Sequence, residues 1–304
     1  MTSQVFSLDD LFNIEQKSDH IIGRFAAMAS PCEVLIETQD PMLANHLTSI
    51  AYKETKRIEQ KFSRYIAGNP LSIINNSQGK AVNIDDEIFR LLEFANTCFE
   101  LSEGMFDISS GVLGKAWKFD GSDHLPRPKA VEALMPFIGW QKVKYDRSSI
   151  SLAKGMQLDF GGIGKEYAVD CVAKLCSEFA PTTSVVVNFG GDIQVTRPRQ
   201  NKQAWHIGIE SLENDKQATQ LLKIYSGGLA TSGDARRYLL KDGIRYSHIL
   251  NPKTGYPIKD AARSVTVAAP HCIQAGLLAT LALLQGNAAE IFLQEQGVKF
   301  WCYR

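Results

Sequence analysis

Residues 159–170 read DFGGIGKEYAVD, a glycine-rich segment followed by a helical pattern. Gly161, Gly162 and Gly164 allow a tight turn, and Lys165 follows them where apolar residues begin to recur at helical spacing. A phosphate at such a helix start would meet free amide donors, the positive end of the helix dipole and an ammonium group. A plain strand-to-helix turn with a solvated lysine explains the same residues equally well.

The spacing of these glycines differs from that of two common nucleotide-binding motifs. A Walker A loop requires GxxxxGK[ST], and a dinucleotide fingerprint requires GxGxxG inside a βαβ unit. The GGIGK segment matches neither of them. The sequence therefore disfavours a nicotinamide dehydrogenase, which is the common alternative for glycine-rich turns.

The chain on either side of the turn alternates between helical and extended patterns. A helix is expected over about 163–179, where Ala168 and Val172 share one face, and a buried strand is expected over 184–188. Further helices are expected over about 43–64, 86–101, 129–138, 273–284 and 288–296, and further strands over 33–38, 205–209, 221–225, 229–231, 246–250 and 264–268, with short strands near 143 and 150. This order favours an α+β fold over a regular βαβ sheet.

The composition is that of an ordinary globular protein. The chain has 304 residues, of which 44% are hydrophobic and 22% are charged. Its 33 basic residues balance its 33 acidic residues, so no overall charge attracts nucleic acid or an anionic membrane, and neither is an expected partner. A ligand that carries phosphate would need a local site.

The terminal segment and the cysteines predict a cytoplasmic protein. The segment MTSQVFSLDDLFNIEQKSDH lacks a basic stretch followed by an apolar one, and no window holds the roughly eighteen apolar residues of a spanning helix. The six cysteines are scattered without the spacing of a zinc site, which favours reduced, mostly buried thiols. A catalytic role for Cys272, beside His271, is the less favoured alternative.

Glycine and small polar residues cluster at four further places. These are GMFDISSG at 104–111, NFGGD at 188–192, ATSGD at 230–234 and YSHILNPKTGYP at 246–257. Each brings main-chain N–H groups within reach of a ligand, and each alone could be an ordinary turn. In the last of them, His248 has the near-neutral pKa that suits a base for a hydroxyl nucleophile, although a lone histidine is more often structural.

In this order, the segments resemble the ApbE family, the FAD:protein FMN transferases. The resemblance begins at Met28 in AAMAS and continues through FSRY at 62–65, GMFD at 104–107, DFGGIGKEYAVD, NFGGD, ATSGD and HILNPKTGYP. It ends with SVTV at 264–267 and AGLLAT at 275–280, and so covers nearly the whole chain.

The resemblance implies a fold, a domain organisation and a reaction. The fold is α+β and related to the T-fold, with two intertwined lobes and a flavin cleft between them. A single flavin transferase domain spans 24–304 after an N-terminal extension over 1–23. The reaction moves FMN from FAD to a Thr or Ser hydroxyl of a target flavoprotein and releases AMP.

The resemblance also assigns site residues. Contacts to FAD fall on Met28, Tyr65, Met105, Phe106, Asp107, Asp159 and Lys165. A thioether and aromatic rings suit flat apolar ring systems, while an ammonium group suits a diphosphate. His248 lies at the family's histidine and is the candidate catalytic base for the acceptor hydroxyl.

The family uses Mg²⁺, and the chain departs from the family at the metal. The resemblance assigns the Gly162 carbonyl and Thr280 to Mg²⁺, but Gly276 stands where the family has an aspartate. Neutral ligands alone bind Mg²⁺ weakly. Glu166, at a position where glycine is common, offers a carboxylate near the metal position or complements the helix dipole. Asn251 replaces an aspartate after the histidine and can still form an Asx turn.

Three functions are compatible with these residues. An Mg²⁺-dependent FAD:protein FMN transferase is the leading hypothesis. A non-catalytic FAD-binding protein is the alternative that Gly276 suggests. A weak FAD pyrophosphatase, in which water replaces the acceptor hydroxyl and gives FMN and AMP, is the third.

Overall fold

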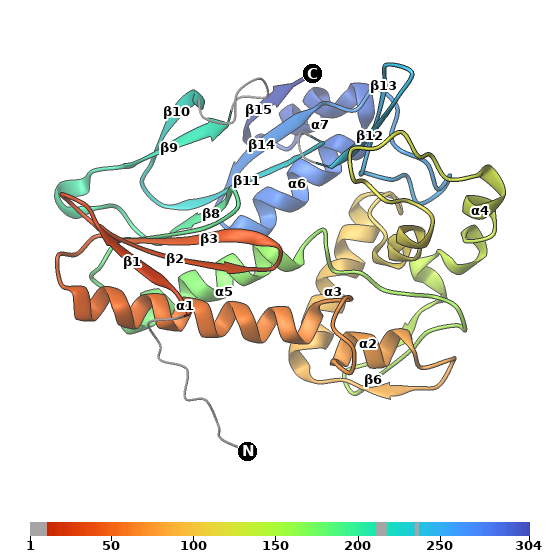
Figure 1. Cartoon of the computed structure of the whole chain (residues 1–304), viewed down its shortest axis with the longest axis horizontal. Coiled ribbons are helices and arrows are strands. Elements are labelled where there is room, and N and C mark those ends of the chain that lie inside the picture. Colours follow the sequence, from red (N-terminus) through yellow and green to blue (C-terminus); the bar gives the residue numbers. More distant parts are fainter. Residues whose placement is uncertain (1–10, 211–217, 235–236) are drawn as a thin grey trace. The chain divides into compact units, whose positions relative to one another are not determined.

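The computed structural model describes residues 11–210, 218–234 and 237–304, and the chain divides into two compact units. The first contains the described residues of Met1–Glu59, Ile163–Thr231 and Thr266–Gly276, and the second those of Gln60–Gly162, Ser232–Val265 and Leu277–Arg304. Each unit therefore combines three separate stretches, so the two are intertwined along the sequence. Helices and strands are mixed in both, which confirms the predicted α+β class (Figure 1).

The first unit is built on a largely antiparallel sheet. Its strands follow the order β1 (Asn13–Gln16), β2 (Ile21–Ala27), β3 (Ser30–Ile36), β7 (Val185–Phe189), β8 (Asp192–Val195), β11 (Gly227–Gly233) and β14 (Ser264–Ala269), the last two extending past the unit boundary. The neighbours from β1 to β11 pair antiparallel. Val185, Val186 and Val187 are all buried, as expected of a central strand covered on both faces. The hairpin of β9 (Trp205–Glu210) and β10 (Ala218–Ile224) and the 3₁₀ helix η5 (Gln200–Lys202) complete the unit.

Two helices pack on this sheet. Helix α1 (Pro41–Phe62) lies so close to β2 that a Cβ added at Gly23 would stand 2.0 Å from Oγ1 of Thr48. Helix α5 (Gly164–Phe179) packs against β7 and β8, and both helices lie along the same side of β1–β3 in Figure 1. Helix α6 (Cys272–Leu284) begins in this unit, where the carboxylate of Asp170 accepts the N–H groups of its first two residues at 3.0 Å each. The side chain on α5 therefore caps α6.

The second unit is assembled from short elements. Its helices are α2 (Pro70–Asn75), α3 (Asp86–Leu101), α4 (Pro128–Glu132) and α7 (Ala289–Glu295), and its 3₁₀ helices are η2 (Ile108–Lys115), η3 (Met135–Phe137), η4 (Trp140–Lys142) and η6 (Gly286–Ala288). The strands β4 (Val82–Asn83), β6 (Ser149–Ser151) and β5 (Lys144–Tyr145) form one sheet in that order. The unit also contains the hairpin of β12 (Tyr238–Lys241) and β13 (Ile244–Ser247), and the strand β15 (Lys299–Tyr303). A buried cluster of Val112, Leu113, Trp117, Val131, Ile138 and Leu239 packs η2, α4 and β12 together.

The predicted elements agree with the structure where a long periodic pattern supports them. The helices expected over 86–101, 163–179 and 273–284 are α3, α5 and α6, with ends that shift by at most one residue. The helix expected over 129–138 is shorter, because α4 ends at Glu132 and the proline at 136 lies in η3, where it supplies no backbone donor.

Two expectations about the whole chain can be compared with the described residues. No helix among them is long and apolar enough to cross a membrane. Four of the six cysteine side chains, Cys32, Cys98, Cys176 and Cys272, are buried, as predicted. Burial raises the pKa of the Cys272 thiol well above its ordinary value, so this side chain is a poor nucleophile.

The close approach of α1 to β2 predicts a stability defect in Gly23→Ala. The added methyl group collides with Thr48, so we expect a loss of about 1–3 kcal/mol in the free energy of unfolding, measured by urea denaturation. Thr48→Ala removes the two closest atoms, at 2.0 and 2.4 Å, but leaves the Cβ at 2.7 Å. The double variant should therefore lose less than the sum of the two single variants. Additive losses would contradict a direct collision.

Candidate functional site

An ion pair between a half-buried lysine and a buried aspartate occupies the start of α5 in the first unit. Lys165 Nζ lies 2.8 Å from Oδ2 of Asp192, whose side chain is only 3% exposed. The main-chain N–H of Thr231 donates to Oδ1 of the same aspartate at 3.3 Å. Burial alone lowers the pKa of Lys165, but the charge of Asp192 and its hydrogen bond outweigh this effect and leave the pKa above its ordinary value. Lys165 is therefore a fixed cation rather than a solvated surface lysine.

The NFGGD turn places its backbone beside this cation. Gly190 and Gly191 join β7 to β8 as a two-residue loop, with φ of 62° and 99°. Both angles lie in the left-handed region that a type I′ hairpin turn requires. A Cβ added at Gly190 would stand 2.3 Å from Oγ of Ser30 and 3.9 Å from Lys165 Nζ. The absence of a side chain thus brings the turn, a hydroxyl group and the ammonium group together.

The start of α5 has no side-chain cap among the described residues. Ile163 is the N-cap residue of the helix, and its side chain caps no backbone N–H group. Anions are stabilised at such a helix end by the amide donors and the helix dipole. Together with Lys165, this arrangement favours the phosphate-binding interpretation of GGIGK over the plain turn.

Glu166 is the second ionisable side chain of this turn, and it points into the protein. Its Oε2 atom is buried and has no hydrogen-bond partner among the described residues. Burial, and after it the negative charge of Asp192, raise the pKa of Glu166. A Cβ added at Gly276 would stand 2.7 Å from Cγ and 2.8 Å from Oε1 of Glu166. The glutamate side chain therefore fills the space beside Gly276.

Met28 occupies a strained turn in the first unit. Met28 and Ala29 join β2 to β3 with φ of 52° and 54°, although neither is a glycine. The N–H of Met28 donates to Oε1 of Glu59 on α1. Backbone strain of this kind costs about 1–3 kcal/mol per residue and is concentrated at functional sites. The geometry is thus compatible with the ligand contact predicted for Met28.

In the second unit, the carboxylate of Asp107 organises the GMFD segment. It caps η2 by accepting hydrogen bonds from the N–H and the hydroxyl group of Ser109, at 2.7 and 2.6 Å. It also accepts a hydrogen bond from the N–H of Trp140 at 3.0 Å. The neighbouring Phe106 is buried and packs at Gly162, where an added Cβ would stand 3.2 Å from its ring. Met105 is half-buried. Asp107 therefore holds the segment in place, whatever further contact it makes.

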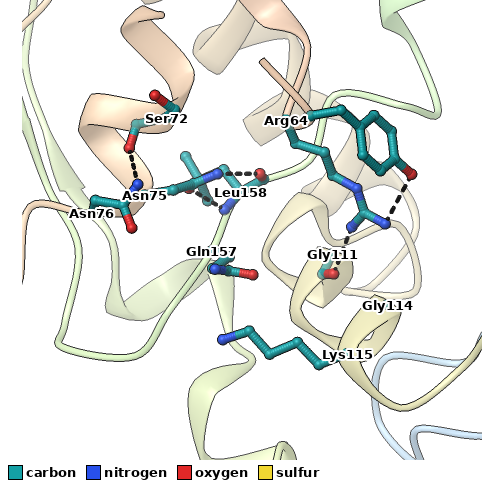
Figure 2. Close-up of a pocket in the computed structure, with 10 residues that line it drawn as sticks. Arg64, Ser72, Asn75, Asn76, Gly111, Gly114, Lys115, Gln157 and Leu158 are labelled. Atoms are coloured by element: carbon teal, nitrogen blue, oxygen red, sulfur yellow. Dashed lines mark hydrogen bonds between the residues drawn. The ribbon is translucent and has the colours of Figure 1, made fainter. Parts of the chain in front are cut away.

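Asp159 and Arg64 form a second polar group in this unit, and Figure 2 shows the contacts of Arg64 with Gly111 and Tyr65. Arg64 Nη1 lies 3.1 Å from Oδ2 of Asp159 and donates to the carbonyl of Gly111 at 2.8 Å. Its Nη2 donates to the hydroxyl of Tyr65 at 3.1 Å, and the Tyr65 side chain is exposed. These contacts place an aromatic ring and a cation at the edge of one cavity.

That cavity has a volume of about 190 Å³ and lies within the second unit. It is lined by Arg64, Tyr65, Ser72, Asn75, Asn76, Gly111, Gly114, Lys115, Gln157 and Leu158. Figure 2 shows the side chain of Lys115 extending toward Gln157. A volume below about 300 Å³ is small for a dinucleotide, so the cavity alone can receive only part of one.

His248 has the geometry of a neutral base. Its Nδ1 lies 3.1 Å from the carbonyl oxygen of Arg237, which can only accept, so Nδ1 carries the proton. The neutral ring then keeps a free electron pair on Nε2. Burial, and after it the charge of Arg237, lower the pKa of His248, so the neutral form is favoured. The ring can therefore accept a proton near neutral pH.

The remaining predicted residues of the second unit lie in turns, apart from Thr280, which lies in α6. Asn251 forms the expected Asx turn, because its side chain accepts the N–H of Lys253 at 2.8 Å and its carbonyl accepts that of Gly255 at 2.8 Å. Thr280 Oγ1 donates to Oγ of Ser232 at 3.3 Å. Gly162 is exposed.

Three residues of these groups, Asp192, Arg64 and Ser30, had no predicted role. Asp192 lies in the quoted NFGGD motif, and its place directly after a two-glycine loop was the available signal. Arg64 lies in the quoted FSRY motif but no partner for it was predicted. Ser30 lies in the quoted AAMAS segment, but no role was predicted for it, because the pairing of β3 with β7 is what brings it to the NFGGD turn.

The ion pair predicts a pH-dependent defect in Lys165→Met. Because burial raises the pKa of Asp192, folding favours its protonated form, and the cost of ionising it grows as pH rises above its ordinary value of 3.8. Removal of the lysine should cost about 3 kcal/mol of unfolding free energy at pH 8 and less at pH 5.

The matched control is Lys174→Met on the same helix. Lys174 is exposed and lies 3.9 Å from Glu178, so its loss should change stability by less than about 1 kcal/mol at either pH. Equal denaturation midpoints for the two variants would refute the buried pair.

Comparisons with known proteins cover most of the chain. The ApbE family model matches residues 28–301. The chain is 30% identical over 253 residues to the FAD:protein FMN transferase of Chlamydia pneumoniae, spanning 77% of this chain and 78% of that protein. It is 27% identical over 272 residues to the FAD:protein FMN transferase of Klebsiella pneumoniae, spanning 87% and 83%.

Solved structures agree with this relation. The crystal structure of the ApbE protein from Thermotoga maritima matches with a TM-score of 0.84 and 28% identity, over 93% of this chain and 94% of that one. The apo flavinyl transferase ApbE of Pseudomonas stutzeri matches with a TM-score of 0.81 over 96% and 91%, and at 23% identity it supports the fold alone. The family model and the relatives together show that the chain belongs to the ApbE family.

Proposed function

We propose that the protein is an FAD:protein FMN transferase. The observation that carries this proposal is the match, over most of the chain, to relatives that bear this name. The geometry adds a fixed cation at an uncapped helix start and a histidine with a free nitrogen. These are the groups that a diphosphate substrate and a hydroxyl nucleophile require.

The proposed reaction is a phosphoryl transfer to a protein hydroxyl. The side-chain oxygen of a Thr or Ser in the target flavoprotein attacks the FMN-side phosphorus of FAD, and Nε2 of His248 takes the hydroxyl proton. The bond from that phosphorus to the bridging oxygen breaks, and AMP leaves with the bond electrons. Lys165 and the amide donors at the start of α5 stabilise the charge on the diphosphate.

The predicted FAD contacts are retained as part of the proposal. In the first unit they are Met28 and Lys165, and in the second they are Tyr65, Met105, Phe106, Asp107 and Asp159. The strained turn at Met28 and the exposed ring of Tyr65 support ligand contact. For Asp107, whose carboxylate already accepts three hydrogen bonds, we propose that the role is to hold the segment that carries Met105 and Phe106.

Mg²⁺ is the cofactor that the family implies, and the side chain of Glu166 suits it as a ligand. Glu166 offers a buried carboxylate oxygen that accepts no hydrogen bond from the part of the chain that the structure describes, and hard oxygen ligands are those that Mg²⁺ prefers. Mg²⁺ is usually held by one or two carboxylates together with substrate phosphates. When bound, it would neutralise charge on the diphosphate. The Gly162 carbonyl and Thr280 remain the predicted neutral ligands.

The cell compartment and the domain span also remain proposals. Scattered and mostly buried cysteines are typical of proteins in a reducing compartment, which supports the cytoplasm. The match to the family model from residue 28 supports a transferase domain over 24–304.

The proposed function is tested by incubating the protein with FAD, Mg²⁺ and a target domain that carries a Thr-containing flavinylation motif. We expect the target to gain the mass of FMN, with equimolar AMP, in intact-mass and nucleotide analysis. AMP and FMN without an adduct would instead identify a pyrophosphatase. FAD binding without either product would identify a non-catalytic protein.

His248→Ala tests the proposed base. General-base catalysis contributes about 10²–10⁴-fold, so transfer should fall by at least about 100-fold while FAD binding persists. FAD binding is measured by flavin fluorescence in the absence of the target. An equal loss of binding and transfer would make His248 a binding residue.

The pH profile of the wild type tests the protonation state of His248. Because burial lowers the pKa of the ring below 6.5, the base is mostly neutral at pH 6.5 and is protonated only at lower pH. We therefore expect kcat/KM to remain high down to pH 6.5 and to fall below it. A decline that begins above pH 7.5 would contradict this assignment.

A further inference from the structure

Glu166 is a half-buried side chain with one buried carboxylate oxygen, to which the reaction proposed above assigns no proton transfer or phosphate contact. Its Oε2 atom has no hydrogen-bond partner among the residues that the structure describes and no access to solvent. A buried carboxylate oxygen is unfavourable unless a donor or a cation meets it. A cation in contact with Oε2 would remove this unfavourable state.

The charges around Glu166 do not balance. The nearby carboxylates are Asp192 and Asp170, and the nearby cation is Lys165. Asp192 already accepts from Lys165 and from the N–H of Thr231, and Asp170 already accepts two N–H groups of α6. One positive charge therefore faces three acidic groups, and Glu166 is the one with a buried oxygen that accepts nothing.

Gly276 is sterically complementary to Glu166. A Cβ at position 276 would stand 2.7 Å from Cγ, 2.8 Å from Oε1 and 3.0 Å from Cδ of the glutamate. A separation below about 3.0 Å does not occur between such atoms, so no larger residue fits at 276 while Glu166 keeps this position. The Glu166 side chain thus occupies the space that a side chain at position 276 would fill.

We propose that Glu166 binds a divalent cation, Mg²⁺ or Mn²⁺, and supplies the carboxylate that position 276 lacks. Phosphate oxygens of the substrate and water complete the coordination, as is usual for Mg²⁺. The phosphate part of this statement rests on the proposed function, whereas the role of Glu166 does not. Gly276 then marks a relocated metal ligand.

Mn²⁺ is the probe for this site, because its electron paramagnetic resonance signal is lost on binding. Wild-type protein with FAD should bind Mn²⁺, and added Mg²⁺ should displace it. Glu166→Gln keeps the shape of the side chain and removes the charge. Loss of an outer-shell partner alone costs about 10–100-fold in metal affinity, so loss of this ligand should cost at least about tenfold.

The matched control is Glu178→Gln, which removes one charge from an exposed position on the same helix. It should leave Mn²⁺ affinity unchanged within about twofold, because exposed charges are screened. FAD affinity in metal-free buffer should be the same in all three proteins. Wild-type Mn²⁺ affinity in Glu166→Gln, or no Mn²⁺ binding by the wild type, would overturn the proposal.

The relation between positions 166 and 276 is tested by moving the carboxylate from the first position to the second. Gly276→Asp alone should lower the thermal midpoint and give no gain in Mn²⁺ affinity, because the new side chain collides with Glu166. The double variant Glu166→Gly, Gly276→Asp should bind Mn²⁺ more tightly than Glu166→Gly alone. A gain in affinity from Gly276→Asp alone, or no recovery in the double variant, would refute this relation.

Metal binding and FMN transfer can fail separately. If Glu166→Gln loses Mn²⁺ but the wild type transfers no FMN, the inference stands and the proposed function fails. If the wild type transfers FMN and Glu166→Gln binds Mn²⁺ normally, the function stands and the inference fails.

Discussion

The ion pair between Lys165 and Asp192 constrains the first unit more than any other contact. The lysine begins α5, and the aspartate begins β8 directly after a two-glycine loop. Because Asp192 is almost fully buried, it needs both the ammonium group and the Thr231 N–H, and these fix the helix, the turn and β11 relative to one another. A fixed cation beside an uncapped helix start follows from this constraint. The contact of Glu166 with Gly276 lies on the same helix, where Asp170 caps α6.

Polar contacts hold the second unit in a different way. The carboxylates of Asp107 and Asp159 each accept backbone or guanidinium donors, and these bonds shape short segments that lack long helices or strands. The same bonds position Phe106, Tyr65 and the rim of the cavity in Figure 2. His248 gains its tautomer from a single carbonyl contact. Residues predicted to touch the ligand therefore also hold the backbone that presents the site.

The sequence predicted long elements and motif turns better than it predicted partners. Helices α3 and α5 were predicted because their apolar residues recur at helical spacing over sixteen residues each. Strands β1 and β2 were not predicted. Arg24 and the small residues Ala26 and Ala27 interrupt the apolar pattern of β2, and β1 is polar. The ion pair of Lys165 with Asp192 and the contact of Glu166 with Gly276 join residues far apart in the sequence. No local pattern encodes such contacts, so only the sheet order and the packing of α5 and α6 reveal them.

Cation binding by Glu166 is measured most directly by anomalous diffraction from Mn²⁺ in a crystal of the wild-type protein with FAD. This role of Glu166 predicts a single anomalous peak in contact with its Oε2 atom, within about 2.5 Å, and also in contact with a phosphate oxygen of FAD. A peak whose ligands exclude Glu166, with the glutamate oxygen still unpartnered, would contradict it.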